Sequence, residues 1–185
     1  MFKECYYKKY VMIDFFSDII FSKEECDSIL KLNDGFNTIN NSKVEIAIPS
    51  KRKSKFGKVT NIELLESIIL PKVSRFGILN LKNSQPMFIQ YNVGDYFKPH
   101  TDVTYGSDSS TIRIYTLIIQ LSDSDDYEGG TLRVENNYAT RDRGTAIIFR
   151  SDKVHELTEV SRGSRNILVC MFSSKDLVLN KTSII

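Results

Sequence analysis

The sequence predicts an α+β protein, in which helices near the N-terminus are followed by short strands that pack as a sandwich. Two helical patterns lie before residue 75, and from residue 87 short β-branched or aromatic runs alternate with Gly, Asp, Asn and Ser. This order is typical of helices segregated from antiparallel sheets. At 185 residues, with 41% hydrophobic and 26% charged residues, the chain suits one globular core.

The first helix is marked by a capping box, in which Ser22 precedes Glu25 by three residues. A serine at the N-cap and a glutamate at the third helical position satisfy each other's backbone amides. We expect this helix to run to about Leu32, because Asn-Asp-Gly at 33–35 is a turn-forming segment.

The second helix is predicted to begin at Thr60, with Glu63 completing a similar capping pair. Pro71 should kink or interrupt this helix, because proline lacks an amide hydrogen and its ring crowds the preceding turn. Helical spacing gathers the apolar residues into one stripe. The stripe comprises Leu64, Leu65, Ile68 and Ile69.

Six strands are predicted in the second half of the chain. Each is a short run of β-branched or aromatic residues bounded by turn-forming residues. Gly94 and the pair Gly129-Gly130 lie where tight turns need positive φ, so we interpret them as structural. The predicted strands cover residues 87–92, 113–122, 131–135, 145–150, 155–160 and 167–172.

The chain contains two histidines, and their setting predicts a metal site. His100 lies two residues before Asp102, and alternate side chains of an extended segment point to the same side. His155 must then join them through the fold. Two imidazoles and one carboxylate can occupy one face of an octahedral Fe(II) and leave the other face open for a co-substrate and dioxygen. Ligand types alone do not choose the metal, so a zinc or other cupin-like metal enzyme stays open.

The residues around this H-x-D motif resemble a known family. Residues 90–102, QYNVGDYFKPHTD, resemble the Y-x-x-G-x-x-F-x-x-H-x-D signature of the 2-oxoglutarate and Fe(II)-dependent prolyl 4-hydroxylases, with every position in register. Residues 125–132 resemble the D-Y-x-G-G-x-L turn of the small microbial hydroxylases, and residues 143–172 are similar to their distal half. Residues 16–26 resemble the entry strand and first helix of the family, whereas residues 35–60 do not match.

The resemblance implies a double-stranded β-helix, the jelly-roll core also seen in cupins, with N-terminal supporting helices. A single Fe(II)/2-oxoglutarate dioxygenase domain is then expected over residues 1–185, with helical support to about residue 80 and the jelly roll over about 85–175. Strands distant in sequence lie side by side at the open end of such a barrel. This arrangement would bring His155 to His100 and Asp102, the expected catalytic metal ligands.

The resemblance also implies two residues that bind 2-oxoglutarate. Arg165, ten residues after His155, matches the basic residue that holds the distal carboxylate in the family, through a bidentate guanidinium contact. Tyr91 matches a tyrosine whose hydroxyl assists it. In the structural alternative, Tyr91 packs in the core and Arg165 pairs at the surface with Glu156 or Glu159.

The implied activity is hydroxylation of an unactivated C–H bond with Fe(II), 2-oxoglutarate and O2, and with ascorbate as a reductant that can keep the iron ferrous. A further polar contact to 2-oxoglutarate is expected from Thr116 or Gln120, between which the sequence does not choose. The implied substrate is a prolyl residue in a peptide or protein. A free amino acid or small metabolite, a nucleic-acid base, and a binding module that has lost catalysis are the alternatives; the intact ligand set speaks against the last.

A basic segment over residues 51–58, KRKSKFGK, has five cations in eight residues. We interpret it as a solvated loop, a lid over the substrate entrance or a phosphate-binding site. A nucleic-acid partner is disfavoured, because the net charge is +2 and no aromatic-basic interleaving extends beyond Phe56.

The cysteines and the apolar runs bear on the cellular compartment. Cys5, Cys26 and Cys170 are too few and too far apart for a disulfide framework or a zinc motif, so we expect them reduced, with Cys170 buried in a strand. No apolar run has membrane-spanning length or signal-peptide character, which predicts a cytoplasmic protein without a membrane partner. The sequence leaves the oligomeric state undetermined: residues 177–179 could mediate dimerisation or close a sheet edge, and residues 180–185 are expected to form a tail.

Overall fold

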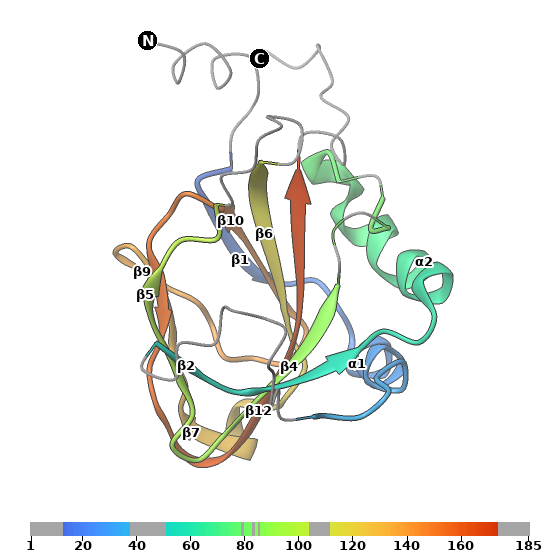
Figure 1. Ribbon diagram of the computed structural model, residues 1–185. Helices are drawn as coiled ribbons and strands as arrows, with labels where there is room; N and C mark the ends of the chain where they lie inside the picture. Colours follow the sequence, from blue (N-terminus) through green and yellow to red (C-terminus); the bar gives the residue numbers. More distant parts are fainter. Residues whose placement is uncertain are drawn as a thin grey trace, which may run out of the picture.

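Two antiparallel sheets face each other in the computed structural model, and two helices cover the outer side of the larger sheet (Figure 1). The structure describes residues 13–37, 51–78, 80–82, 84, 86–103 and 112–173. The expectations for Cys5 and for residues 177–185 lie outside the described residues.

The larger sheet has seven strands in the spatial order β1, β10, β6, β12, β4, β3, with β7 pairing with β12 beside this path. Every pairing in it is antiparallel. The strands are β1 (Phe15–Ile19), β3 (Lys55–Lys58), β4 (Met87–Asn92), β6 (Arg113–Gln120), β7 (Tyr127–Gly129), β10 (Thr145–Arg150) and β12 (Val160–Ser173).

The smaller sheet has five strands in the order β2, β5, β11, β8, β9, again with antiparallel pairings. Its central strand β11 joins β5 to β8, so segments far apart in the sequence become neighbours. The strands are β2 (Arg52–Lys53), β5 (Tyr96–His100), β8 (Leu132–Val134), β9 (Asn137–Tyr138) and β11 (His155–Leu157).

Side-chain alternation along β12 separates two hydrophobic cores. Leu168 and Cys170 pack with the helices, whereas Ile167 and Val169 face the smaller sheet. Residues i and i+2 of a strand share one face, so a strand buried on both faces reads as a continuous apolar run. The core between the sheets also contains two pocket-lining residues, Tyr91 and Ile118.

The first helix, α1 (Lys23–Leu30), begins at the predicted capping box. Ser22 Oγ accepts a hydrogen bond from the Glu25 amide at 3.2 Å, and the Glu25 carboxylate accepts one from the Ser22 amide at 2.7 Å. The helix ends two residues before the predicted Leu32, which is buried in the core beneath it.

The second helix, α2 (Ile62–Val73), corrects two expectations. Its N-cap is Asn61 rather than Thr60, because the Asn61 side chain accepts the Leu64 amide at 2.9 Å while the Thr60 hydroxyl donates to Leu32. Pro71 does not interrupt the helix, which continues to Val73 and into a 3₁₀ turn, η1 (Ser74–Phe76). Burial of Val73 in the helix-side core stabilises the turn that contains the proline.

The apolar stripe of α2 is narrower than predicted. Leu65 and Ile69 are fully buried with Val73, one helical turn apart, whereas Leu64 is 48% exposed and Ile68 is half-buried. The hydrophobic residues were identified correctly from the sequence, but only packing against the sheet shows which of them face inward.

Two of the six predicted strands have the observed bounds, 87–92 and 145–150. The run 155–160 is divided, because β11 stops at Leu157 and Val160 already begins β12, the long strand that replaces the predicted 167–172. The predicted strand 113–122 begins as expected but ends at Gln120, and the predicted strand 131–135 is one residue shorter at each end. Gly94, Gly129 and Gly130 have φ values of 79°, 69° and 54°, as the turn interpretation requires.

The basic segment 51–58 is neither a loop nor a lid. It forms β2, which pairs with β5 in the smaller sheet, and β3, which pairs with β4 in the larger sheet. A segment that contributes a strand to both sheets is held by backbone hydrogen bonds on each side. The charge of this segment did not indicate strands, because its pairing partners β5 and β4 lie far along the chain.

Cys170 is buried in β12, as predicted. Cys26 and Cys170 are buried free thiols, and burial raises the pKa of Cys26 to about 11 and that of Cys170 to about 12. Neither of the described α-helices has the length and apolar character needed to cross a membrane.

Replacing Leu65 with alanine should lower the free energy of unfolding by about 2–5 kcal/mol, because the change removes a fully buried side chain and leaves a cavity beneath α2. Leu64→Ala, one residue away on the exposed side, should change it by less than about 0.5 kcal/mol. Urea unfolding of both variants checks this. Equal losses would mean that α2 does not pack in the register described.

Candidate active site

The two histidines lie at the adjoining ends of two paired strands. His100 is the last residue of β5 and His155 is the first of β11, and the two are direct partners across the antiparallel pair. Asp102 follows β5 by two residues, and its amide donates to the Ser151 carbonyl at 2.8 Å. The fold thus brings together the three residues that the sequence predicted as metal ligands, from positions more than fifty residues apart.

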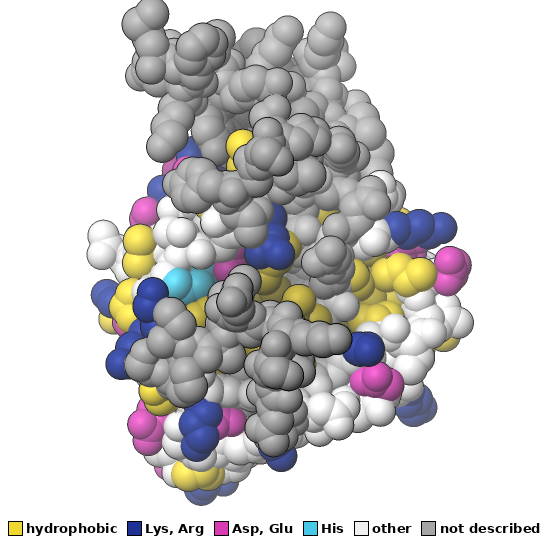
Figure 2. Space-filling model, viewed as in Figure 1, with side chains coloured by type: hydrophobic (Ala, Val, Ile, Leu, Met, Phe, Trp, Pro, Cys, Tyr) yellow, Lys and Arg dark blue, Asp and Glu magenta, His cyan; other side chains and the backbone are white. Residues whose placement is uncertain are grey.

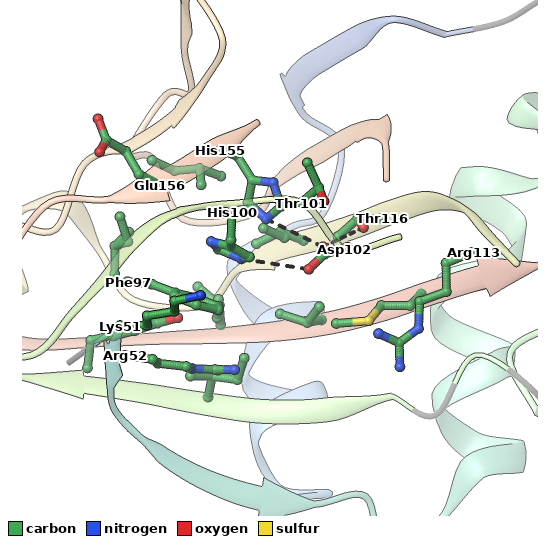
Figure 3. A pocket seen from close by; sticks show the side chains of 18 of the residues that line it. Lys51, Arg52, Phe97, His100, Thr101, Asp102, Arg113, Thr116, His155 and Glu156 are labelled. Atoms are coloured by element: carbon green, nitrogen blue, oxygen red, sulfur yellow. Dashed lines mark hydrogen bonds and ion pairs between the residues drawn. The ribbon is translucent and has the colours of Figure 1, made fainter. Parts of the chain in front are cut away.

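The ligating atoms of these three side chains all lie within 4.8 Å of one another (Figure 3). His155 Nε2 is 3.4 Å from Asp102 Oδ2, and His100 Nε2 is 3.7 Å from Asp102 Oδ1. Two imidazole nitrogens and one carboxylate at this spacing match a facial set of ligands around one metal ion.

Backbone carbonyls orient both imidazoles. His100 Nδ1 donates to the Lys98 carbonyl at 2.8 Å, and His155 Nδ1 donates to the Lys153 carbonyl at 3.0 Å. Because a carbonyl only accepts, each Nδ1 must carry the proton, and each Nε2 keeps its lone pair toward the cluster. Hydrogen bonds of this kind fix the tautomer and ring orientation of metal-binding histidines.

The charge states of the cluster also suit a cation. Burial, reinforced by the neighbouring His155, lowers the pKa of His100 to about 4, so this imidazole is neutral at pH 7. Burial raises the pKa of Asp102, but the neighbouring His155 and the hydrogen bond from the Thr116 hydroxyl outweigh it, so the pKa lies below its ordinary value. An anionic carboxylate beside a neutral imidazole is the form that binds a metal.

Thr116 and Ser151 hold the Asp102 carboxylate. The Thr116 hydroxyl donates to Asp102 Oδ2 at 2.7 Å, and its oxygen lies 3.2 Å from Ser151 Oγ. Since the single Thr116 proton goes to the carboxylate, Ser151 is the donor to Thr116. Ser151 and Thr116 are both fully buried, so this chain fixes the carboxylate away from competing water.

A cavity of ≈ 430 Å³ opens beside the cluster, between the two sheets. Its lining includes all three cluster residues together with Tyr91 and Arg165, the residues expected to bind 2-oxoglutarate. Tyr91 on β4 and Arg165 on β12 are cross-strand partners, and each is 3% exposed.

The structural alternative for Arg165 is wrong. Its guanidinium is buried and Nε donates to Gln120 Oε1 at 3.0 Å, whereas Glu156 pairs with Arg133 at 2.7 Å. The Nε contact leaves the terminal Nη nitrogens of Arg165 as donors toward the cavity that it lines. Arg162, three residues earlier, is exposed and pairs with Glu128.

The structure gives Thr116 and Gln120 different partners. Both lie on the inner face of β6, as their spacing predicted, but Thr116 contacts Asp102 and lines the cavity, whereas Gln120 contacts Arg165. The Gln120 amide also donates to the Tyr127 hydroxyl at 3.2 Å and to the Ser122 carbonyl at 3.1 Å. Gln120 therefore positions the guanidinium.

Three further residues of the site escaped the sequence analysis. Arg52 lies in the cavity wall with its guanidinium 4.5 Å from the Phe97 ring, and Phe97 stacks on His100 with ring centroids 3.4 Å apart. Ser151, described above, is the third. The basic segment 51–58 was visible in the sequence. The pairing of β2 with β5, which brings Arg52 next to Phe97, depends on the tertiary structure.

Comparison with known sequences gives one family. The sequence model of the 2OG-Fe(II) oxygenase superfamily matches residues 86–173. A PKHD-type hydroxylase from a Caulobacter species is 38% identical over 88 residues, or 43% of this chain and 39% of that protein. Another from Prochlorococcus marinus is 30% identical over 134 residues, or 70% of this chain and 59% of that protein. The chain thus spans less than two thirds of the length of these relatives.

Solved structures with the same fold include several prolyl hydroxylases. The viral collagen prolyl hydroxylase of Paramecium bursaria Chlorella virus-1, in complex with 2OG, has a TM-score of 0.64 at 18% identity, covering 86% of this chain and 95% of that one. A Trichoplax adhaerens prolyl hydroxylase, in complex with a hypoxia inducible factor peptide, has a TM-score of 0.58 at 17% identity, covering 88% and 84%. These likenesses confirm the predicted double-stranded β-helix.

The matched stretch contains the five site residues that the sequence predicted. His100, Asp102 and His155 lie within residues 86–173, as do Tyr91 and Arg165. The resemblance seen in the sequence motifs is confirmed by the family match. Over residues 86–173 the chain is therefore similar to the 2OG-Fe(II) oxygenase superfamily.

Proposed function

We propose that residues 1–185 form one catalytic domain, an Fe(II)- and 2-oxoglutarate-dependent dioxygenase that hydroxylates a prolyl residue of a peptide or protein. One observation supports this most: a cluster of two histidines and one carboxylate lines the same cavity as the buried guanidinium of Arg165. His100, Asp102 and His155 would hold the iron, which would supply dioxygen activation: 2-oxoglutarate would be oxidised to succinate and carbon dioxide, and one oxygen atom would enter the substrate C–H bond.

The donor set fits ferrous iron. His100, Asp102 and His155 are proposed as the metal ligands, because their donor atoms converge while both Nδ1 atoms are occupied by carbonyls. Three ligands on one side of an octahedral ion leave positions open for a chelating oxoacid and for oxygen. Ascorbate is proposed as the reductant that keeps the iron ferrous.

The cavity also fits the co-substrate. Arg165 and Tyr91 are proposed to bind the distal carboxylate of 2-oxoglutarate, the guanidinium through its Nη nitrogens and the tyrosine through its hydroxyl. Ile167 and Val169 line the same wall from β12, and an apolar wall strengthens a charged hydrogen bond by excluding water. Gln120 holds the guanidinium in place through Nε.

The choice of a prolyl substrate rests on the relatives. Proteins of the same fold are described as prolyl hydroxylases, one of them bound to a peptide fragment, and sequence relatives are described as PKHD-type hydroxylases. A free amino acid is the second candidate, which the basic cavity wall favours. A binding module without catalysis is disfavoured, because the candidate ligand set and the Arg165 contact are both intact.

Turnover of 2-oxoglutarate tests this function. Protein loaded anaerobically with Fe(II) and then exposed to oxygen should form succinate, and proline-containing peptides should stimulate it. His155→Ala should abolish succinate formation, since it removes one of three ligands. Arg165→Ala should raise the KM for 2-oxoglutarate by about tenfold or more, because a charged bidentate contact is lost.

Arg162→Ala is the matched control for Arg165→Ala, since Arg162 is a solvent-exposed arginine on the same strand, paired with Glu128. It should leave the KM within about twofold of the wild type, as expected for a surface ion pair. A wild-type protein that binds iron but never consumes 2-oxoglutarate would refute the dioxygenase proposal.

Thr116→Val should weaken binding of Mn(II), used as a redox-stable probe of the metal site, by about 10- to 100-fold, because the Asp102 carboxylate loses the hydroxyl that orients it. Thr116→Ser keeps the hydroxyl and should stay much closer to the wild-type affinity. Calorimetric titration measures both, with thermal unfolding to verify that the variants are folded. Equal affinities for the valine and serine variants would show that the Thr116 hydrogen bond does not tune the metal site.

A further inference from the structure

The candidate cavity contains more positive charge than the proposed co-substrate requires. Besides Arg165, its lining includes Lys51, Arg52 and Arg113. Figure 2 shows Lys and Arg atoms on both sides of the histidine on this face of the molecule. Within the part of the chain that the structure describes, none of these four cations lies within ion-pair distance of a carboxylate.

The two acidic residues of the lining do not balance these cations. Glu156 is paired with Arg133 at 2.7 Å, and Asp102 is held by the histidines and Thr116 as a proposed metal ligand. A divalent metal would add two positive charges, and dianionic 2-oxoglutarate would offset two. The remaining cations therefore favour a second anion in the cavity.

Contacts within the protein orient the Arg52 guanidinium for recognising an anion. Arg52 Nε donates to Ser54 Oγ at 2.9 Å, and the guanidinium lies 4.3 Å from the Phe56 ring centroid and 4.5 Å from that of Phe97. Stacking between two rings fixes the plane of the guanidinium and offsets part of the cost of burying it. The fork is thus held in one orientation before any ligand arrives.

One donor of this fork is buried without a partner. Arg52 Nη2 is inaccessible to solvent and has no hydrogen-bond acceptor among the described residues. Buried polar groups in proteins are nearly always satisfied. Arg141 Nε and Arg143 Nε, outside the cavity lining, also have no partner, so the unpaired Nη2 supports an anion at Arg52 only together with the place of this side chain in the cavity wall.

Arg52 also lies close to the proposed metal. Its guanidinium covers one face of Phe97, and the other partner of that ring is His100, stacked at 3.4 Å between centroids and 19° between planes (Figure 3). A group held by Arg52 is therefore separated from the metal cluster by little more than one aromatic ring. Arg113 lines the cavity from β6, on the other side of Asp102 in Figure 3.

We propose that Arg52 binds a carboxylate of the primary substrate and thereby holds the C–H bond to be hydroxylated next to the metal. This inference rests on the proposed function, and it adds a substrate class: the hydroxylated unit carries a carboxylate close to the reacting carbon. The carboxylate comes from the main chain of a free amino acid or from an acidic side chain beside a peptide proline. Arg52 is here a binding residue, distinct from the co-substrate residue Arg165.

Matched acid and amide probes test the proposal. Protein saturated with Mn(II) and 2-oxoglutarate under anaerobic conditions is titrated calorimetrically with L-proline against L-prolinamide, and with acetyl-Pro-Asp-amide against acetyl-Pro-Asn-amide. The acid of one pair should bind about tenfold or more tighter than its amide, because a charged hydrogen bond is gained. The pair that shows the preference identifies the source of the carboxylate.

Variants assign the preference to Arg52. Arg52→Gln should reduce the acid-to-amide ratio to about one, and Arg52→Lys should retain part of it, since the charge stays but the planar fork is lost. Arg75→Gln is the control: Arg75 also stacks on two aromatic rings, Phe16 and Phe76, but it is exposed and outside the cavity lining. It should keep the wild-type ratio. Thermal unfolding of each variant separates lost binding from lost folding.

The outcomes divide clearly. Equal affinities for acid and amide in the wild type, or no binding of any probe at millimolar concentration, would overturn the substrate class. A preference that survives in folded Arg52→Gln would overturn the assignment to Arg52. Failure of the dioxygenase proposal itself is recognised separately, by a calorimetric titration of the Mn(II)-loaded protein with 2-oxoglutarate before any probe is added, in which 2-oxoglutarate would then not bind.

Discussion

The antiparallel pairing of β5 with β11 is the constraint on which the candidate site depends. It makes His100 and His155 direct cross-strand partners, and the turn after β5 then brings Asp102 to both imidazoles. Cross-strand neighbours lie about 5 Å apart at their Cα atoms, which is the scale of a single metal coordination sphere. The helices contribute indirectly, by packing against the outer face of the larger sheet, whereas the larger sheet itself supplies Thr116, Tyr91 and Arg165 to the cavity. A slip of one residue in this register would turn one histidine to the opposite face.

Around this pairing, buried hydrogen bonds decide the chemical state of each group. Backbone carbonyls take both Nδ1 protons, Thr116 and Ser151 hold the carboxylate, and Gln120 holds Arg165. Each contact leaves one atom free for a ligand: Nε2 of each histidine, one carboxylate oxygen and the Nη nitrogens of the arginine. Low dielectric makes such contacts strong when satisfied and costly when broken, so the site is ordered before any ligand binds.

One face of the larger sheet packs against the helices, and the other face lines the cavity. Along β12, the residues that pack with the helices alternate with those that face the cavity, and Arg165 lies on the same strand, facing the cavity, opposite Tyr91. The basic segment 51–58 links the two sheets, so Arg52 reaches the cavity from a strand rather than from a loop. Rigid elements therefore supply both basic residues proposed to bind carboxylates, which suits recognition of groups with fixed geometry.

The sequence by itself determined the residue types of the site, the capping box at Ser22 and two strands to their exact bounds, because these depend on local spacing and side-chain chemistry. Tertiary structure determined three features that depend on contacts distant in the chain. These are the Asn61 cap, the continuation of α2 through Pro71, and the strands formed by residues 51–58. It also distinguished Thr116 from Gln120, since both lie on one face of β6 and differ only in what the neighbouring strands present. Local sequence patterns predict which side chains lie on the same face of a helix or strand. Only the packing of the elements determines which residues that face contacts.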